Sequence, residues 1–304
     1  MTAEEDEPGR LTVAVASGKG GTGKTLVATN LSVLVARRGG EVALVDCDVD
    51  APNAALFLPL PGVRSEPVTV PLPEVDASGC VLCGACRDVC AYGALRVLGG
   101  TVVVFPELCH GCGACVAVCA PRAIVERGRR VGQVEVGRVD SEAAAPGKLD
   151  VITGRLDVGE VKTPAVIRAA RARAVACRTD VVVLDAPPGV ACATVAALRG
   201  ADIVVLVTEP TPFGVHDLGL ALELAHGLGV PAGIVINREG AGATDIAAYC
   251  EAACVPVLAR IPFDRRVASI YAQGRLVLDA HPDAPGWFGG LWDAVRQLAA
   301  KGGR

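Results

Sequence analysis

The sequence has no long uncharged apolar run, no excess of basic residues and no apolar segment near its start. No stretch approaches the roughly eighteen consecutive apolar residues of a membrane-spanning helix, so we expect no stable membrane insertion. The formal net charge of −4 gives no indication of an extended nucleic-acid surface. The first ten residues, MTAEEDEPGR, are acidic and unlike a secretory signal. We therefore expect a disordered tail over residues 1–10 and a cytoplasmic protein that binds no nucleic acid.

Disulfides are not expected either, although the chain has 13 cysteines. A chain without an export signal stays in a reducing compartment, where cysteines more often ligate metals. The length of 304 residues, with 51% hydrophobic and 20% charged residues, describes a globular chain of about two domains.

An apolar run, a glycine-rich loop and a helical pattern follow one another near the start of the chain. Leu11–Ala16 predicts a buried strand, and apolar residues at helical spacing predict a helix as far as Arg37. Between them, G-x-x-x-x-G-K-T forms a P-loop in its required context. Lys24 is expected to reach the β and γ phosphates of ATP, and Thr25 to ligate Mg²⁺. The other loop residues expected to bind the nucleotide are Gly18, Gly20, Gly21, Thr22, Gly23 and Leu26.

The loop carries a second lysine, Lys19, within the sequence SGKGGTGKT. This sequence resembles the deviant Walker motif of the MinD, ParA and nitrogenase iron protein superfamily. The resemblance implies that Lys19 reaches the nucleotide of a partner subunit, and that ATP drives formation of a homodimer or of a heterodimer with a paralogue. A solvated loop lysine is the alternative.

Two further strands are expected to end in carboxylates. Strand Glu41–Val45 leads into the segment DCDVDAPN, and the apolar run Asp180–Leu184 ends in Asp185. Carboxylates at the carboxyl ends of strands beside a P-loop lie where Mg²⁺ and the attacking water sit. By resemblance to switch I of the superfamily, Asp48 positions the water and Asp46 supports the Mg²⁺ shell. Asp185 takes the Walker B position and binds Mg²⁺ through water.

The resemblance also implies an adenine pocket. A strand predicted over Val230–Ile236 is followed by Asn237 and Arg238. In related ATPases this asparagine reads the adenine edge, and the arginine would flank the base. Pro262, in the segment RIPFD, resembles the opposite wall. Ordinary strand ends are the alternative at each position.

Eight cysteines form two blocks with the same spacing, C-x2-C-x2-C-x3-C. Each block matches the cysteine run of a bacterial ferredoxin, so two 4Fe-4S clusters are predicted. Zinc is the competing interpretation, but a doubled four-cysteine run fits it poorly. Alanine replaces the usual proline after the last cysteine of each run, at Ala91 and Ala120, without removing a ligand. Because the fourth cysteine of each run binds the other cluster, cluster 1 takes Cys80, Cys83, Cys86 and Cys119, and cluster 2 takes Cys109, Cys112, Cys115 and Cys90.

These motifs divide the chain. Proline-rich Leu58–Pro73 predicts a linker, and residues 126–150 predict a hairpin that returns to the parent sheet. We expect a doubly wound, mostly parallel α/β P-loop ATPase domain over residues 11–70 and 127–304. A ferredoxin-like α+β domain over residues 71–126 is inserted into it. The apolar face between Trp287 and Ala300 predicts a docked helix, because a membrane anchor would carry more basic residues.

The layout resembles MinD-superfamily ATPases with an inserted ferredoxin domain, and three functions stay open. The first is an ATPase whose cycle gates electron transfer through the two clusters to a redox partner that the sequence does not identify. The second is an iron–sulfur assembly or carrier ATPase of the Mrp type, although the C-x-x-C of those carriers does not follow Asn237. The third is a MinD- or ParA-like positioning ATPase with redox-sensing clusters. No role is predicted for the remaining cysteines, Cys47, Cys177, Cys192, Cys250 and Cys254.

Overall fold

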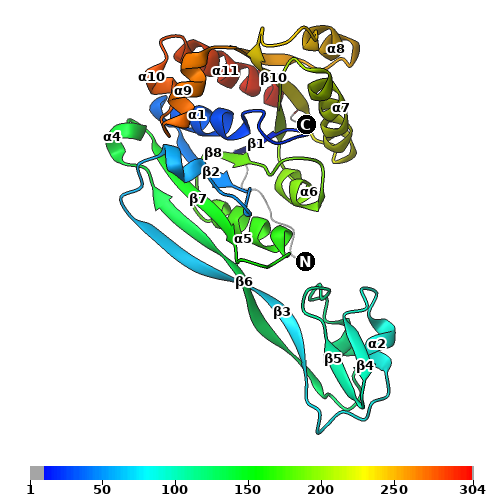
Figure 1. The fold of residues 1–304 in the computed structure, drawn as a ribbon. Coiled ribbons are helices and arrows are strands. Elements are labelled where there is room, and N and C mark those ends of the chain that lie inside the picture. Colours follow the sequence, from blue (N-terminus) through cyan, green and yellow to red (C-terminus); the bar gives the residue numbers. More distant parts are fainter. Residues whose placement is uncertain (1–9, 303–304) are drawn as a thin grey trace.

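A computed structural model describes residues 10–302, so all but the last residue of the predicted tail lies outside the described residues. The main body is an α/β domain, from which a long two-stranded arm extends to a small module (Figure 1). The domain centres on a nine-stranded sheet of order β11-β10-β9-β1-β8-β2-β7-β6-β3. Neighbours from β11 to β7 are parallel, whereas β6 is antiparallel to both β7 and β3. The strands are β1 (Leu11–Ala16), β2 (Glu41–Asp46), β3 (Val63–Val75), β6 (Ile124–Arg138), β7 (Lys148–Leu156), β8 (Val181–Asp185), β9 (Ile203–Thr208), β10 (Ala232–Glu239) and β11 (Val257–Pro262).

Helices cover both faces of the sheet, which confirms the predicted mostly parallel α/β class. The central strands are buried on both sides and therefore apolar along their whole length. One face is covered by α1 (Lys24–Arg37), the 3₁₀ helix η1 (Ala54–Phe57), α4 (Ser141–Ala144), α9 (Arg265–Ala272), α10 (Val277–Ala280) and α11 (Ala284–Gly302). The other face is covered by α5 (Thr163–Val175), α6 (Cys192–Leu198), α7 (Pro212–Gly227) and α8 (Ile246–Ala252).

The C-terminal helix α11 is docked on the sheet, as the sequence predicted. Phe288, Leu291, Trp292 and Val295 are buried in the core that α11 shares with α1. Within residues 10–302, no helix combines the length and apolar character needed to cross a membrane.

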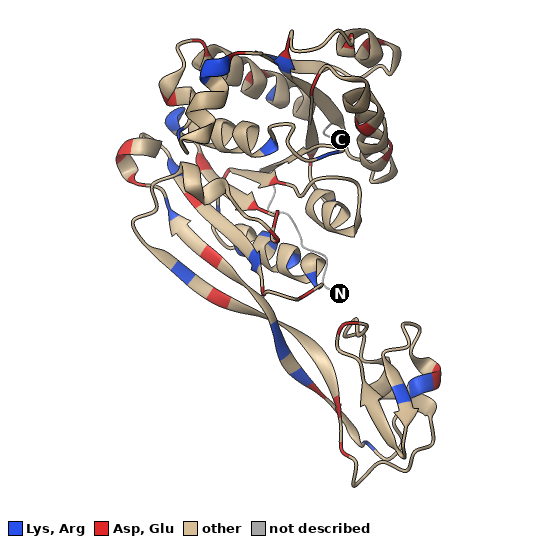
Figure 2. Cartoon of the chain, in the orientation of Figure 1, with Lys and Arg blue, Asp and Glu red and all other residues tan. Residues whose placement is uncertain are grey.

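The proline-rich stretch is a strand rather than the predicted linker. β3 pairs with β6 from Val63 opposite Gly137 to Val75 opposite Ile124, and the two form the arm. Pro67, Pro71 and Pro73 are tolerated because β3 is an edge strand, which has only one neighbour to bond. Charged residues of both signs lie along the arm (Figure 2).

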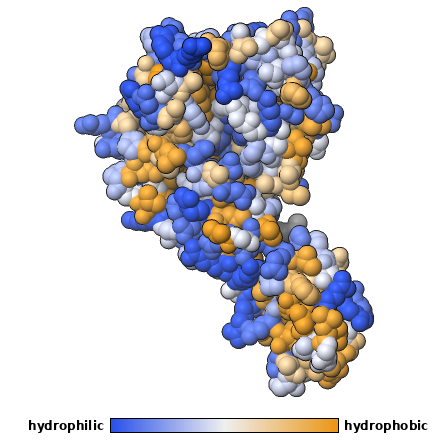
Figure 3. Space-filling model, viewed as in Figure 1, coloured by the Kyte–Doolittle hydropathy of each residue, from blue (hydrophilic) through white to orange (hydrophobic). Residues whose placement is uncertain are grey.

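Residues 76–123 form the module at the tip of the arm. It contains α2 (Ala85–Val89), the antiparallel hairpin of β4 (Leu95–Leu98) and β5 (Thr101–Val104), and α3 (Ala114–Ala117). Its core is small and separate from the cores of the parent domain, with Leu95 and Val102 at its centre beside Cys86 and Cys115. Much of its surface in Figure 3 is apolar, which agrees with exposed fractions of 68% at Val81 and 52% at Leu98.

Candidate functional site

The P-loop connects β1 to α1 at the carboxyl edge of the sheet, where a parallel sheet places its ligands. Gly21 and Gly23 have φ of 78° and 101°, a left-handed conformation that glycine adopts at low cost. Gly18 is required for a different reason, because a Cβ there would lie 2.0 Å from the carbonyl oxygen of Asp217 in α7. The glycines therefore let the loop turn before α1 and pass close to α7.

A cavity of about 390 Å³ opens beside this loop. Of the predicted nucleotide-site residues, its wall includes Gly20, Gly21, Gly23, Lys24, Thr25, Leu26, Asp48, Asn237, Arg238 and Pro262. Gly18, Lys19, Thr22, Asp46 and Asp185 do not form part of the wall.

The predicted wall segment RIPFD continues into α9, whose contribution to the cavity sequence reasoning missed. Phe263, Asp264, Val267 and Tyr271 line the cavity, and Phe263 is 54% exposed. The ring of Tyr271 stacks on Phe57 at 4.7 Å between centroids, which fixes α9 beside the cavity. An exposed phenylalanine directly after Pro262 was the available signal, since an apolar ring in such a wall suits a planar base.

Asp46 organises the segment that follows β2. Its Oδ2 accepts hydrogen bonds from the backbone N–H groups of Asn53 and Ala54 at 2.8 and 2.9 Å, and Oδ1 accepts one from Asp48 at 3.1 Å. Burial raises the pKa of Asp46 to about 6, although these backbone bonds act in the opposite direction. The carboxylate thus holds Asp48 and Asn53 at the cavity wall from a fully buried position.

Asp185 lies at the end of β8, beside Asp46 in the parallel register. Burial and the charge of Asp46 raise its pKa well above the usual range, against the lowering effects of Thr25 and Lys24. The Thr25 hydroxyl is close enough to affect Asp185, yet neither carboxylate oxygen has a well-formed hydrogen bond within residues 10–302. Burial likewise lowers the pKa of Lys24, and Asp185 and Asp48 oppose that effect. Asp46 and Asp185 are thus two buried carboxylates beside one lysine, and both oxygens of Asp185 lack a hydrogen-bond partner within residues 10–302. This arrangement fits a site for a divalent cation.

Asn237 and Arg238 lie inside β10, which extends to Glu239, rather than after the strand as predicted. The Asn237 amide is 4% exposed, and its Nδ2 donates to the carbonyl oxygen of Thr22 at 2.7 Å. Its Oδ1 accepts a hydrogen bond from the backbone of Arg238 at 2.9 Å. The side chain therefore anchors the P-loop to β10 at the edge of the cavity.

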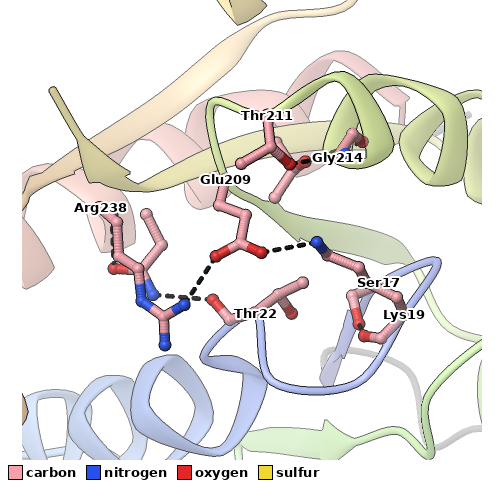
Figure 4. A network of polar contacts seen from close by, with 9 residues as sticks. Ser17, Lys19, Thr22, Glu209, Thr211, Gly214 and Arg238 are labelled. Carbon is pink, nitrogen blue, oxygen red and sulfur yellow. Dashed lines mark hydrogen bonds and ion pairs between the residues drawn. The ribbon is translucent and has the colours of Figure 1, made fainter. Parts of the chain in front are cut away.

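Lys19 contacts a carboxylate of its own chain (Figure 4). Its Nζ lies 2.6 Å from Oε1 of Glu209, and Oε2 of Glu209 accepts a hydrogen bond from Nη1 of Arg238 at 2.7 Å. Partial burial acts to raise the pKa of Glu209, but Lys19 and Arg238 outweigh it and lower that pKa. The Lys19 side chain is thus engaged within the subunit and does not line the cavity.

The eight module cysteines surround two small cavities. Cys80, Cys83, Cys86 and Cys119 line one, and Cys90, Cys109, Cys112 and Cys115 line the other. Backbone N–H groups point at two of the sulfurs, from Ala94 to Cys90 at 3.3 Å and from Gly111 to Cys109 at 3.4 Å. Within residues 10–302, no three His, Cys, Asp or Glu side chains converge closely enough to hold a single metal ion. Four sulfurs spread around a cavity fit a polynuclear cluster, in which different iron atoms bind different cysteines.

The two cysteine loops repeat the same backbone conformations. Leu82 has φ of 55°, and Gly111, at the equivalent place in the second run, has φ of 63°. Gly84 and Gly113 correspond in the same way, with φ of 79° and 73°. The turn is therefore set by the cysteine spacing, and the first loop keeps it even with a leucine in the left-handed region.

A P-loop at the carboxyl edge of a parallel sheet, with buried carboxylates at the ends of β2 and β8, defines a P-loop nucleotide-binding protein. A family model described as the CobQ/CobB/MinD/ParA nucleotide binding domain matches residues 13–277. The chain belongs to this family.

Among relatives, an uncharacterised protein of Methanocaldococcus jannaschii, MJ0578, is 31% identical over 270 residues, which cover 88% of this chain and 90% of that protein. The uncharacterised ATP-binding protein MJ0547 of the same organism is 24% identical over 294 residues, with coverage of 96% and 87%. An iron–sulfur cluster carrier protein of Synechocystis is 43% identical, but only over 63 residues, 21% of this chain and 18% of the carrier. The structure of the septum site-determining protein MinD with Mg-ADP from Pyrococcus horikoshii has a TM-score of 0.58 and 20% identity, covering 97% of this chain and 99% of that one. The last likeness shows the fold alone.

Proposed function

We propose that this chain is a Mg²⁺-dependent ATPase whose nucleotide cycle controls electron transfer through two 4Fe-4S clusters in the module. Lys24 and Thr25 would hold the phosphates and the cation, and the orphaned carboxylate of Asp185 suits a magnesium-bound water. Asp48, at the cavity wall, is the residue for positioning the attacking water. Family membership and the fold support nucleotide binding, and the two four-cysteine cavities support the clusters. When bound, such clusters accept and donate single electrons.

The proposed coupling between the nucleotide site and the clusters depends on one loop, which contacts the segment around Asp48, the arm and the module. This is the segment Asp157–Lys162, between β7 and α5. Directly before it, the Leu156 N–H donates to the carbonyl oxygen of Val49 at 2.9 Å, and Val49 follows Asp48. A movement of the segment around Asp48 would therefore pull on the start of the loop.

The loop is attached to the arm at two places. The Asp157 N–H donates to the carbonyl oxygen of Val131 in β6 at 3.0 Å, and its carboxylate pairs with Nε of Arg130 at 3.0 Å. Glu160 forms an ion pair with Arg129. Both arginines lie on β6, so two positive charges of the arm hold the loop.

The end of the loop contacts the module. Nζ of Lys162 donates to the carbonyl oxygen of Glu107 at 2.9 Å, two residues before Cys109. The next turn of the module packs on the arm, because a Cβ at Gly111 would lie 2.9 Å from Pro71. The second cluster cavity is therefore tied to the nucleotide edge by short contacts, in addition to the covalent path along β3.

A carrier function is the second candidate. It is favoured by the similarity to iron–sulfur cluster carrier proteins, one of which, from Pyrococcus abyssi, is 42% identical over 65 residues. That match covers 21% of either chain, and no C-x-x-C follows Asn237. A carrier would release its iron to an apo-protein, whereas the gating proposal requires the clusters to stay in place through the cycle.

The test is the rate at which a chelator removes iron from protein purified without oxygen, with Mg-ADP and with a non-hydrolysable ATP analogue. We expect the rate to differ between nucleotides, and the difference to shrink in Lys162→Ala, which loses the contact to Glu107. Lys148→Ala is the matched control, because Lys148 forms an exposed pair with Glu41 away from the module. Equal rates with both nucleotides would contradict gating, and complete transfer of iron to an apo-acceptor during turnover would favour the carrier.

A further inference from the structure

A second cavity lies on the opposite side of β1 and β8 from α1. It has a volume of about 210 Å³, roughly half that of the nucleotide cavity, and its floor is apolar, with Val182 and Leu184 of β8. Helices α5 and α6, which pack side by side in Figure 1, supply its walls. Three arginines line it: Arg10 before β1, Arg171 on α5 and Arg199 at the end of α6.

Within residues 10–302, neither Arg171 nor Arg199 pairs with a carboxylate. No Asp or Glu of residues 10–302 lines it. The nearby Asp202 carboxylate accepts a hydrogen bond from the Thr12 N–H at 2.7 Å. Nη1 of Arg171 donates to the carbonyl oxygen of Ala196 at 2.8 Å, and this is the only hydrogen bond of the side chain within the described part of the chain. Arg199 makes no side-chain hydrogen bond or ion pair with any residue in the range 10–302.

The position of Arg171 is fixed by its surroundings. The hydrogen bond to Ala196 holds its guanidinium against α6. The turn that follows α6 contains Gly200, which has φ of 75°. A Cβ at Gly200 would lie 3.7 Å from Nη2 of Arg171, so this nitrogen faces the turn that carries Arg199. Two guanidinium groups from different helices thus line one cavity while most of their N–H donors are unused. Guanidinium groups bind phosphate and carboxylate oxygens through paired N–H donors.

We propose that this cavity binds a small phosphorylated metabolite, with its phosphoryl oxygens on Arg171 and Arg199 and its hydrocarbon part on the apolar floor. A ligand smaller than a nucleotide suits this cavity, whose volume is about 210 Å³ against about 390 Å³ for the cavity at the P-loop. The site is separate from the P-loop: none of the residues that line one cavity lines the other. Anion binding here does not depend on the clusters or on ATP hydrolysis.

The probe is inorganic pyrophosphate, titrated by calorimetry in magnesium-free buffer into the full-length chain carrying Lys24→Ala, which weakens phosphate binding at the P-loop. We expect one pyrophosphate per chain. Adding Arg199→Gln should weaken binding at least about ten-fold, because a charge-assisted hydrogen-bonding group is lost. Arg171→Gln should do the same. Arg168→Gln, which changes an exposed arginine of the same helix outside the cavity, should leave the affinity unchanged.

Circular dichroism of each variant checks that it folds. Of the two substitutions, Arg199→Gln is less expected to disturb folding, because Arg199 is exposed and its side chain makes no hydrogen bond or ion pair within residues 10–302. The proposal is overturned if the Lys24→Ala chain binds no pyrophosphate. It is also overturned if Arg199→Gln and Arg168→Gln bind pyrophosphate equally well, since the binding would then lie elsewhere.

Discussion

Replacing Glu209 with glutamine should strengthen ATP-dependent dimerisation. In the single subunit, Nζ of Lys19 lies 2.6 Å from Glu209, so a Lys19 that reaches into a partner subunit must first leave this carboxylate. The side chains of Lys19 and Glu209 are 29% and 13% exposed, which makes the pair partly buried and worth about 1 kcal/mol. A symmetric dimer breaks two such pairs, or about 2 kcal/mol in total. Removing the charge of Glu209 should therefore tighten dimerisation up to about thirty-fold.

The assay is sedimentation velocity across a range of protein concentrations with Mg-ATP, in an Asp48→Ala background that slows turnover. Glu239→Gln is the matched control, because Glu239 is on the same strand as Arg238 and pairs with Arg260 rather than with Lys19. If Glu209→Gln leaves the dimer dissociation constant unchanged, or if Glu239→Gln tightens it equally, the release of Lys19 from its own chain is not a step of dimerisation.

Three further predictions concern the metal, the lysines and acid stability. Protein purified without oxygen should be brown and contain about eight irons per chain, and stoichiometric zinc without a visible charge-transfer band would rule out the clusters. Lys24→Ala should abolish tight ATP binding in equilibrium dialysis, whereas Lys19→Ala should keep binding and lose dimerisation; equal loss of binding would exclude a role in trans. The pKa of Asp264 is lowered by Arg266 and His281, so its contribution to stability is present above the unfolded value of about 3.9 and is lost as pH falls through the folded value. Asp264→Asn should therefore lower the melting temperature above about pH 4, with the difference disappearing in stronger acid; a constant difference at all pH values would contradict this.

Local patterns predicted the parts of the fold that depend on neighbouring residues. The strand and helix around the P-loop were read correctly because buried parallel strands are apolar throughout and α1 has apolar residues at helical spacing. The cysteine grouping followed from the match of the spacing to the bacterial ferredoxin run, and the structure places the same two sets around two cavities.

Strand pairing and side-chain contacts between residues far apart in the sequence could not be predicted from local patterns. Leu58–Pro73 was interpreted as a linker because a proline-rich run cannot form a regular helix, and only the pairing with β6 shows that much of it is an edge strand. No role was predicted for Glu209, because its contact with Lys19 joins residues far apart in the sequence. The contacts of Lys162 and Arg171 arise the same way and carry no local signal.

The measurement that tests the central claim most directly is a redox titration of the clusters in the full chain, with Mg-ADP and with a non-hydrolysable ATP analogue. A coupling of about 1–3 kcal/mol corresponds to a shift of roughly 40–130 mV for a one-electron couple. The gating account predicts a shift of this size, together with a matching difference in nucleotide affinity between oxidised and reduced protein. Identical potentials with both nucleotides, and identical nucleotide affinities in both redox states, would contradict it.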